Sequence, residues 1–192
     1  MIFIIMLSYI IGSIPFGLIL SHIGGYGDIR KVGSQNIGAT NVFRVNKGLA
    51  FLTLVLDSLK GFIVIFILSQ YVNDKDFLFI CSLFIVIGHI FPIWLKFKGG
   101  KGISSFIGVL SALEYNLSLS FVITWIIVFY FSRYSSLSSI IAVIISLLFV
   151  FLFYEGSNFI VHFLCSLFVI LQHYDNIVRL VKGQENKIEF KL

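Results

Sequence analysis

Long apolar runs, each about the length of a membrane-spanning helix, recur along this chain. A helix needs about 20 mostly apolar residues to cross the hydrocarbon core of a bilayer. Runs of that length occupy residues 2–23, 48–70 and 77–95. Hydrophobic residues make up 58% of the 192 residues and charged residues only 12%, which is more apolar surface than a soluble fold of this size can bury. The sequence therefore predicts an all-α, polytopic membrane helix bundle.

The later part of the chain adds further apolar runs. Residues 103–132 are apolar except where polar residues at 114–116 interrupt them, which favours two short helices over one long helix. Runs at 138–154 and 157–172 follow. We therefore expect seven spans, of which the fourth and fifth are short. Pro15 lies within the first run and predicts an opening in the first helix.

The charged residues indicate an orientation in the membrane, because cytoplasmic loops are enriched in lysine and arginine. With seven spans and the N-terminus outside, every lysine and arginine except Lys75 falls at or near the cytoplasmic face, and the C-terminus is cytoplasmic. One long helix over residues 103–132 would instead place the basic C-terminal tail outside. In the seven-span arrangement, four acidic residues fall in the external turns: Asp74, Asp76, Glu114 and Glu155.

Composition also excludes several classes of protein. No linker or internal repeat divides the chain, so residues 1–192 are expected to form a single integral membrane domain. The net charge of +5 is carried by short segments, which is typical of membrane loops and not of a nucleic-acid-binding surface. One alternative function is a metal-dependent alcohol phosphotransferase, which would need clustered carboxylates to bind magnesium. The sequence disfavours that function and we expect no metal site, because no such cluster is apparent. The candidate cytoplasmic acids are scattered: Asp28, Asp57, Asp175, Glu185 and Glu189.

The first cytoplasmic loop, residues 33–44, combines glycines, amides and hydroxyls with a guanidinium. Glycines allow successive backbone N–H groups to converge on an anion. Ser34 and Thr40 add hydroxyl donors, and Arg44 offers a fork suited to a phosphate. The alternative is an ordinary turn rich in asparagine, glycine and serine. Composition alone gives the two interpretations similar weight.

The loop that follows the third run places three glycines around Lys101, just before a predicted helix. Exposed amides, a helix N-terminus and an ammonium group together favour phosphate binding. The spacing is not that of a Walker A loop, so nucleotide hydrolysis is not expected. The alternative is a flexible, positively charged loop without a ligand.

Two further groups of polar residues suggest chemistry. On a helix, His173 and Asn176 would share one face, and a histidine there could take a proton from a hydroxyl. A histidine that only caps the helix or reaches the interface is the alternative. Asp57 and Lys60 lie within an apolar run, where ionisable groups either pair with each other or line a polar site.

Taken together, these segments resemble the three motifs of the bacterial acyl-phosphate-dependent glycerol-3-phosphate acyltransferases, the PlsY family. The first family motif, Ser-Gly-Asn-x-Gly-x-Thr-Asn, has Gln35 here in place of its glycine, and Arg44 stands where the family has an essential arginine. The remaining residues of the first motif match: Ser34, Asn36, Gly38, Thr40 and Asn41.

The second and third family motifs are matched as well, and in the same order along the chain. The second motif corresponds to Gly88, His89, Pro92, Phe97, Gly99, Gly100, Lys101 and Gly102. The third corresponds to His173, Asn176, Ile177, Arg179, Leu180 and Glu185. Three spaced motifs are far more specific than any one alone, and the resemblance extends over nearly the whole chain.

The resemblance implies an enzyme of the bacterial inner membrane with its active site at the cytoplasmic face. It would transfer a fatty acyl group from acyl phosphate to the 1-hydroxyl of glycerol 3-phosphate, releasing phosphate and lysophosphatidic acid, which is the first step of phospholipid synthesis. No cofactor is implied. The implied partners are the two substrates, membrane lipid and the enzyme that makes acyl phosphate.

The resemblance also implies roles for residues. Glu185 would give structural support. We expect Arg44 and the glycine loop to hold glycerol 3-phosphate, with His173, oriented by Asn176, as general base unless the donor's own phosphate takes the proton. Ser34 would either bind phosphate or carry the acyl group. The catalytic residues would be Ser34, Arg44, His173 and Asn176, and the substrate-binding residues Asn36, Gly38, Thr40, Asn41, Lys60, Gly88, His89, Gly99, Gly100, Lys101 and Gly102.

The main alternative function is a membrane transporter of phosphate or of a small organic phosphate. Broken spans and helix N-termini also build transport sites. A transporter would be expected to carry polar residues near the bilayer midplane and an internal repeat. The polar residues of this chain gather at one predicted membrane face, which favours the enzyme.

Overall fold

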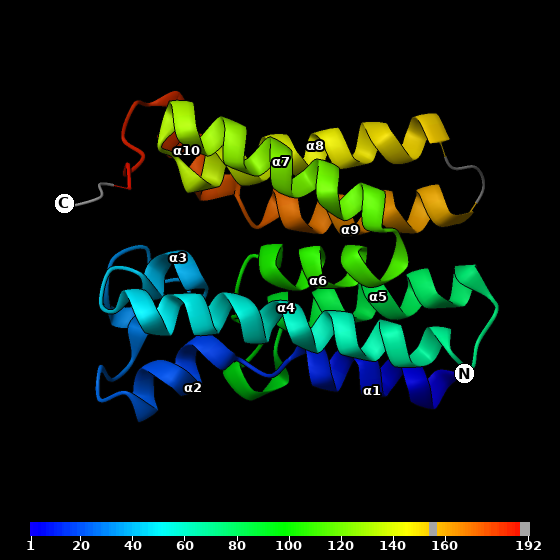
Figure 1. The fold of residues 1–192 in the computed structure, drawn as a ribbon. Coiled ribbons are helices and arrows are strands. Elements are labelled where there is room, and N and C mark those ends of the chain that lie inside the picture. Colours follow the sequence, from blue (N-terminus) through cyan, green and yellow to red (C-terminus); the bar gives the residue numbers. More distant parts are fainter. Residues whose placement is uncertain (154–156, 189–192) are drawn as a thin grey trace. The chain divides into compact units, whose positions relative to one another are not determined.

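The computed structural model describes residues 1–153 and 157–188, and throughout these residues the chain forms helices and turns without a strand. The predicted external turn at Glu155 lies outside the described residues. Figure 1 shows the helices in chain order. They are α1 (Ile2–Gly12), α2 (Phe16–Ile23), η1 (Ile29–Lys31), α3 (Ala39–Val42), α4 (Lys47–Ser69), α5 (Lys75–Ile90), η2 (Ile93–Leu95), α6 (Ile103–Leu113), α7 (Tyr115–Ser132), α8 (Ser135–Phe153), α9 (Ser157–Leu171) and α10 (Tyr174–Val181).

Five segments of the described chain are long and apolar enough to cross a membrane, and a sixth is added if the bent pair formed by α9 and α10 counts as one. The two helices of that pair meet at 57°. The predicted division at residues 114–116 is present, because α6 ends at Leu113 and α7 begins at Tyr115. With 11 residues, α6 is about 16 Å long and shorter than a bilayer core. The chain is thus an all-helical membrane protein.

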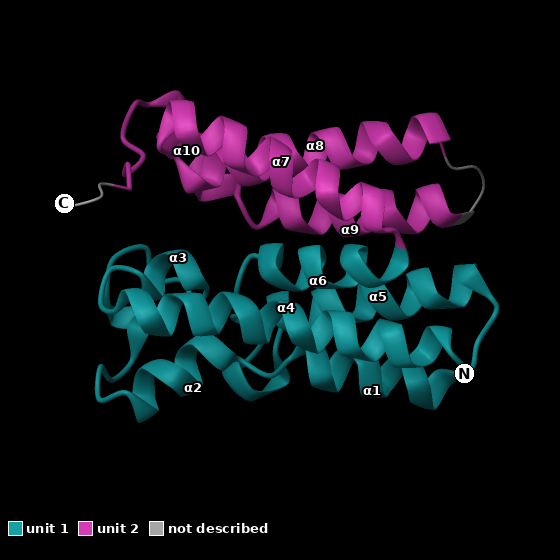
Figure 2. Ribbon diagram, viewed as in Figure 1, with its two compact units in different colours: residues 1–113 teal, residues 114–192 magenta. Residues whose placement is uncertain are grey.

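The chain divides into two compact units, Met1–Leu113 and Glu114–Leu192 (Figure 2). In the first unit α4 packs against α6, and α1 packs against α5. In the second unit α8 packs against both α7 and α9. Large apolar side chains are exposed on the helices of each unit, including Phe51 and Phe66 on α4 and Phe151 on α8. Such surfaces suit contact with lipid.

The first span is broken between α1 and α2, as Pro15 predicts. Proline has no backbone N–H and cannot continue the hydrogen bonds of a helix. At the break, the Ser13 hydroxyl donates to the Ile10 carbonyl at 2.6 Å and accepts a hydrogen bond from the Trp94 indole N–H at 2.7 Å. The break therefore connects the first span with the end of the third.

Glycines bring the helices of the first unit into close contact. A side chain at Gly12 of α1 would collide with the backbone of α5 at Ile85, and one at Gly88 of α5 would collide with the Tyr9 carbonyl of α1. The pair α4 and α6 is built in the same way, with Gly108 against the Ser58 carbonyl. Small residues allow this approach between membrane helices. Gly88, predicted to bind substrate, thus packs helix against helix.

Candidate active site

Asn41 lies at the centre of the first loop. Its side chain is 0% exposed. The amide nitrogen lies 2.8–3.0 Å from three backbone carbonyl oxygens, those of Ile29, Val32 and Asn36. The amide oxygen accepts a hydrogen bond from the backbone N–H of Ser34 at 3.0 Å. One buried side chain therefore satisfies backbone groups along the whole loop and fixes its path.

The backbone around Ser34 turns sharply on both sides of the serine. Gly33 has φ of 56° and Gln35 has φ of 60°, both in the left-handed region. Gln35 thus keeps the conformation that glycine adopts most readily, at the position where the family motif has glycine. A side chain at Gly33 would collide with Asn41 and with the aliphatic part of Arg44. Ser34 and Arg44 are themselves exposed.

An apolar cluster beneath the first loop also contacts the beginning of the glycine-rich loop. The cluster consists of the buried residues Ile29, Ile37, Val42 and Ala50. Leu95, the last residue of η2, packs against it. The structure therefore brings the loop that carries Ser34 and Arg44 next to the segment that leads into Lys101.

The glycine-rich loop is bonded to the end of α5. The Gly99 N–H donates to the Ile90 carbonyl, and the Gly100 N–H donates to the His89 carbonyl, both at 3.0 Å. The expectation that these two glycines present exposed amides is therefore wrong. They are glycines because a side chain at Gly99 would collide with α5 and one at Gly100 with the His89 ring.

The backbone amides that can face a ligand lie further along, at the start of α6. The first hydrogen bond within this helix runs from the Phe106 N–H to the Gly102 carbonyl at 2.8 Å. The N–H groups of residues 103–105 precede it and have no partner within the helix. Gly102 has φ of 87° and so allows the chain to turn into α6. Lys101, which is half-buried, stands just before this helix N-terminus.

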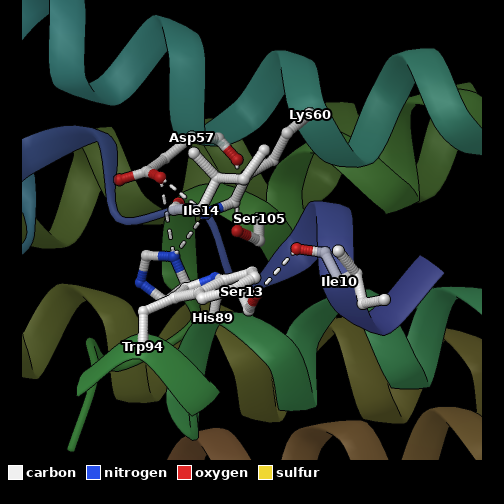
Figure 3. Close-up of polar contacts among 8 residues, drawn as sticks. All are labelled: Ile10, Ser13, Ile14, Asp57, Lys60, His89, Trp94 and Ser105. Carbon is white, nitrogen blue, oxygen red and sulfur yellow. Dashed lines mark hydrogen bonds and ion pairs between the residues drawn. The ribbon is translucent and has the colours of Figure 1, made fainter. Parts of the chain in front are cut away.

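Asp57, Lys60 and His89 meet inside the first unit (Figure 3). Their exposed fractions are 1%, 5% and 4%. The Lys60 ammonium lies 2.7 Å from Asp57 Oδ1 and 3.0 Å from His89 Nδ1. The Asp57–Lys60 pair considered from the sequence is thus present, and its histidine partner was not foreseen. All three residues belong to segments that are long and apolar enough to cross a membrane.

The third motif lies in the second unit, where Glu185 joins three polar side chains. One carboxylate oxygen accepts hydrogen bonds from the Ser136 hydroxyl at 2.7 Å and the Asn176 amide at 2.6 Å. The other accepts from Arg179 Nε at 2.6 Å. Burial by itself would raise the pKa of Glu185, but these three hydrogen bonds and the arginine charge outweigh it and hold the pKa below its usual value.

His173 stands at the start of α10 and is buried. Its Nδ1 lies 2.8 Å from the Val169 carbonyl oxygen, which can only accept a hydrogen bond. This contact assigns the proton to Nδ1 and leaves the lone pair on Nε2. The ring is thus held in the tautomer that a general base acting through Nε2 requires.

The structure places the predicted residues in two groups. The residues of the first and second motifs belong to the first unit, and those of the third motif to the second unit. Ser13, Ser105 and Ser136 join the polar networks without having been predicted. No local pattern could indicate them, because serines are common in membrane helices.

Comparison with known proteins gives consistent results. The family model for glycerol-3-phosphate acyltransferase matches residues 2–183. A glycerol-3-phosphate acyltransferase of Ehrlichia canis is 56% identical over 96% of this chain and 97% of its own length. One of Ehrlichia chaffeensis is 52% identical over 98% and 97%. The crystal structure of PlsY, an integral membrane glycerol 3-phosphate acyltransferase in its glycerol 3-phosphate form, superposes with a TM-score of 0.93 at 36% identity, covering 98% of this chain and 95% of that one.

Proposed function

This chain belongs to the glycerol-3-phosphate acyltransferase family, and on that premise we propose that it transfers a fatty acyl group from acyl phosphate to the 1-hydroxyl of glycerol 3-phosphate. The single observation that supports this most strongly is the extent of the family match. It runs from residue 2 to residue 183 and so includes the first two polar loops together with His173 and Asn176. The products are lysophosphatidic acid and inorganic phosphate.

Glycerol 3-phosphate is a dianion that needs several donors, and the first unit offers three kinds. The Arg44 guanidinium is exposed on the first loop and suits bidentate contact with a phosphate. Lys101 adds a positive charge, and the α6 N-terminus adds backbone amides and the positive end of a helix dipole. Three further residues of the first motif, Asn36, Gly38 and Thr40, are proposed to line this site.

The transfer itself is a direct displacement. The oxygen of the 1-hydroxyl attacks the carbonyl carbon of acyl phosphate, the new ester bond forms, and the bond from that carbon to the phosphate oxygen breaks. The electron pair leaves with phosphate, whose charge Ser34 and Lys101 stabilise. The hydroxyl proton goes to His173 Nε2 or to a phosphate oxygen of the donor. Asn176, on α10, and Glu185, in the segment after α10, support the histidine.

We also propose that the enzyme lies in the bacterial inner membrane and crosses it seven times. The spans are α1 with α2, then α4, α5, the short α6, α7, α8 and α9. The N-terminus is outside, and both the polar loops and the C-terminus face the cytoplasm, in agreement with the excess of lysine and arginine there. The donor reaches the site from an enzyme that makes acyl phosphate, and no cofactor takes part.

The test is product formation by purified protein in detergent. Acyl phosphate and glycerol 3-phosphate are supplied without metal or coenzyme A, and phosphate and lysophosphatidic acid are both quantified. Equal amounts of the two products are expected from the wild type, with Ser34→Ala and His173→Ala strongly impaired.

The exposed residue His22 and the half-buried residue Ser69 give matched controls. Ser69→Ala and His22→Ala make the same substitutions outside the three motifs and should retain activity. If the folded wild type forms no lysophosphatidic acid with acyl phosphates of any chain length, the proposed reaction is wrong. Uptake of phosphate into vesicles would then support the transporter.

A further inference from the structure

The Lys60 ammonium uses all three of its hydrogens inside the protein (Figure 3). They point to Asp57 Oδ1 at 2.7 Å, the Ile14 carbonyl at 2.8 Å and His89 Nδ1 at 3.0 Å. An ammonium group has three donors and no acceptor. Lys60, predicted from the sequence to bind substrate, therefore has no hydrogen left for a ligand in this arrangement.

The histidine of this group connects the ion pair to the glycine-rich loop. Because His89 Nδ1 accepts a hydrogen bond from the ammonium, the ring proton lies on Nε2. The ring packs so closely on Gly100 that a side chain there would collide with Nε2. The His89 carbonyl accepts the Gly100 N–H at 3.0 Å. The loop is thus held by both the backbone and the ring of one residue.

The Lys60 ammonium and the backbone of Asp57 each reach a further element of the first unit. The Ile14 carbonyl belongs to the break between α1 and α2, where it also accepts the Phe16 N–H at 3.2 Å. On the other side, the Ser105 hydroxyl at the start of α6 donates to the Asp57 carbonyl at 3.1 Å. The ion pair thereby fixes the broken span, α4 and the end of α5 relative to one another, and the bond from Ser105 to the backbone of Asp57 adds the start of α6.

We propose that Asp57, Lys60 and His89 form a buried positioning triad that sets the glycine-rich loop, and with it Lys101 and the α6 N-terminus, for binding glycerol 3-phosphate. None of the three touches the substrate. Two buried charges are expensive in a membrane helix bundle and often contribute little net stability. The triad is therefore assigned to the geometry of the site. The inference rests on the proposed function, since it names what holds its phosphate-binding loop.

The first experiment removes the ion pair without leaving a single buried charge. The double variant Asp57→Asn/Lys60→Met loses both charges and the hydrogen bond to His89. Its KM for glycerol 3-phosphate should rise by about tenfold, while its KM for acyl phosphate and its thermal unfolding temperature stay near those of the wild type. Thr53→Val is the matched control, because Thr53 is buried on the same helix and its hydroxyl donates to the Leu49 carbonyl within that helix.

The second experiment tests the contact between the triad and the loop. Gly100→Ala in the wild-type background should raise the KM for glycerol 3-phosphate, because the new methyl group meets the His89 ring. In a His89→Ala background the ring is absent, so the additional effect of Gly100→Ala should be at least severalfold smaller. Such coupling in a double-mutant cycle is not expected from two independent losses of stability.

Two outcomes would overturn the inference. One is a folded double variant whose KM for glycerol 3-phosphate is unchanged. The other is an equal rise in KM for both substrates, which would indicate general damage to the fold. A failure of the proposed function looks different, because the wild type itself would then form no lysophosphatidic acid and its thermal unfolding temperature would not respond to glycerol 3-phosphate.

Discussion

The side-chain oxygen of Asn41 accepts a hydrogen bond from the backbone N–H of Ser34 at 3.0 Å. The residue that shapes the first loop thereby holds the candidate catalytic serine. Asn41→Asp should retain this bond and lose the amide donors to three loop carbonyls. The Ile29 and Val32 carbonyls still accept backbone N–H groups, whereas the Asn36 carbonyl loses its amide donor at 2.8 Å. A carbonyl left without a donor costs about 1–3 kcal/mol, so the unfolding temperature in detergent should fall and activity should be lost.

The matched control for this change is Asn46→Asp. The Asn46 side chain caps α4 by accepting the Leu49 N–H at 2.9 Å, and an aspartate caps equally well. Its unfolding temperature should stay near that of the wild type. A similar loss of stability in both variants would show that the position of Asn41 is not special.

Gln35 provides a test of backbone strain. A residue other than glycine in the left-handed region costs about 1–2 kcal/mol, and glycine costs roughly 0.5–1 kcal/mol in extra chain entropy. Gln35→Gly should therefore raise the free energy of unfolding by up to about 1 kcal/mol. Gln35→Ala keeps the strain and should leave stability nearly unchanged. Equal stability of the glycine and alanine variants would indicate that φ at this position is not left-handed.

The contribution of Arg44 to activity should depend on the planar shape of its guanidinium as well as on its charge. A lysine cannot make the paired hydrogen bonds of a guanidinium to a phosphate. Arg44→Lys should lower kcat/KM for glycerol 3-phosphate by about tenfold or more, equivalent to roughly 1.4 kcal/mol. Arg30→Lys, an exposed position that pairs with Asp28 at 2.7 Å, should leave the kinetics unchanged. Full activity of Arg44→Lys would argue against bidentate phosphate binding.

Glu185 should make the stability of the second unit depend on pH. Its folded-state pKa is lowered, so the carboxylate stabilises the fold above the pKa of the unfolded chain, about 4.3, and this contribution is lost as pH falls through the folded pKa. The unfolding temperature of the wild type should drop below about pH 4.

A glutamine at this position removes the titration. The Glu185→Gln variant should be less stable at pH 7, and the difference from the wild type should shrink on acidification. Asp175→Asn, at an exposed carboxylate of α10, should have the unfolding temperature of the wild type both at pH 7 and after acidification. A stability gap for Glu185→Gln that does not change with pH would contradict this account.

The sequence alone determined the helices and the kind of loop between them. The predicted runs at 48–70 and 77–95 correspond to α4 (Lys47–Ser69) and to Lys75–Leu95, and the opening at Pro15 is present. These features are local, because the length of an apolar run and the missing N–H of a proline act on the residues beside them. The family resemblance, carried by short motifs with fixed spacing, was likewise readable and is shown by the comparisons.

Only the tertiary structure decided which partners the polar residues take. Lys60 and His89 are 29 positions apart, and no periodicity in the sequence indicates that they meet at 3.0 Å. Likewise, Gly100 looked like a source of exposed amide, yet its N–H is bonded to the end of α5 and its lack of a side chain makes room for a histidine ring. Such pairings follow from which helices pack together, and that depends on the whole chain at once.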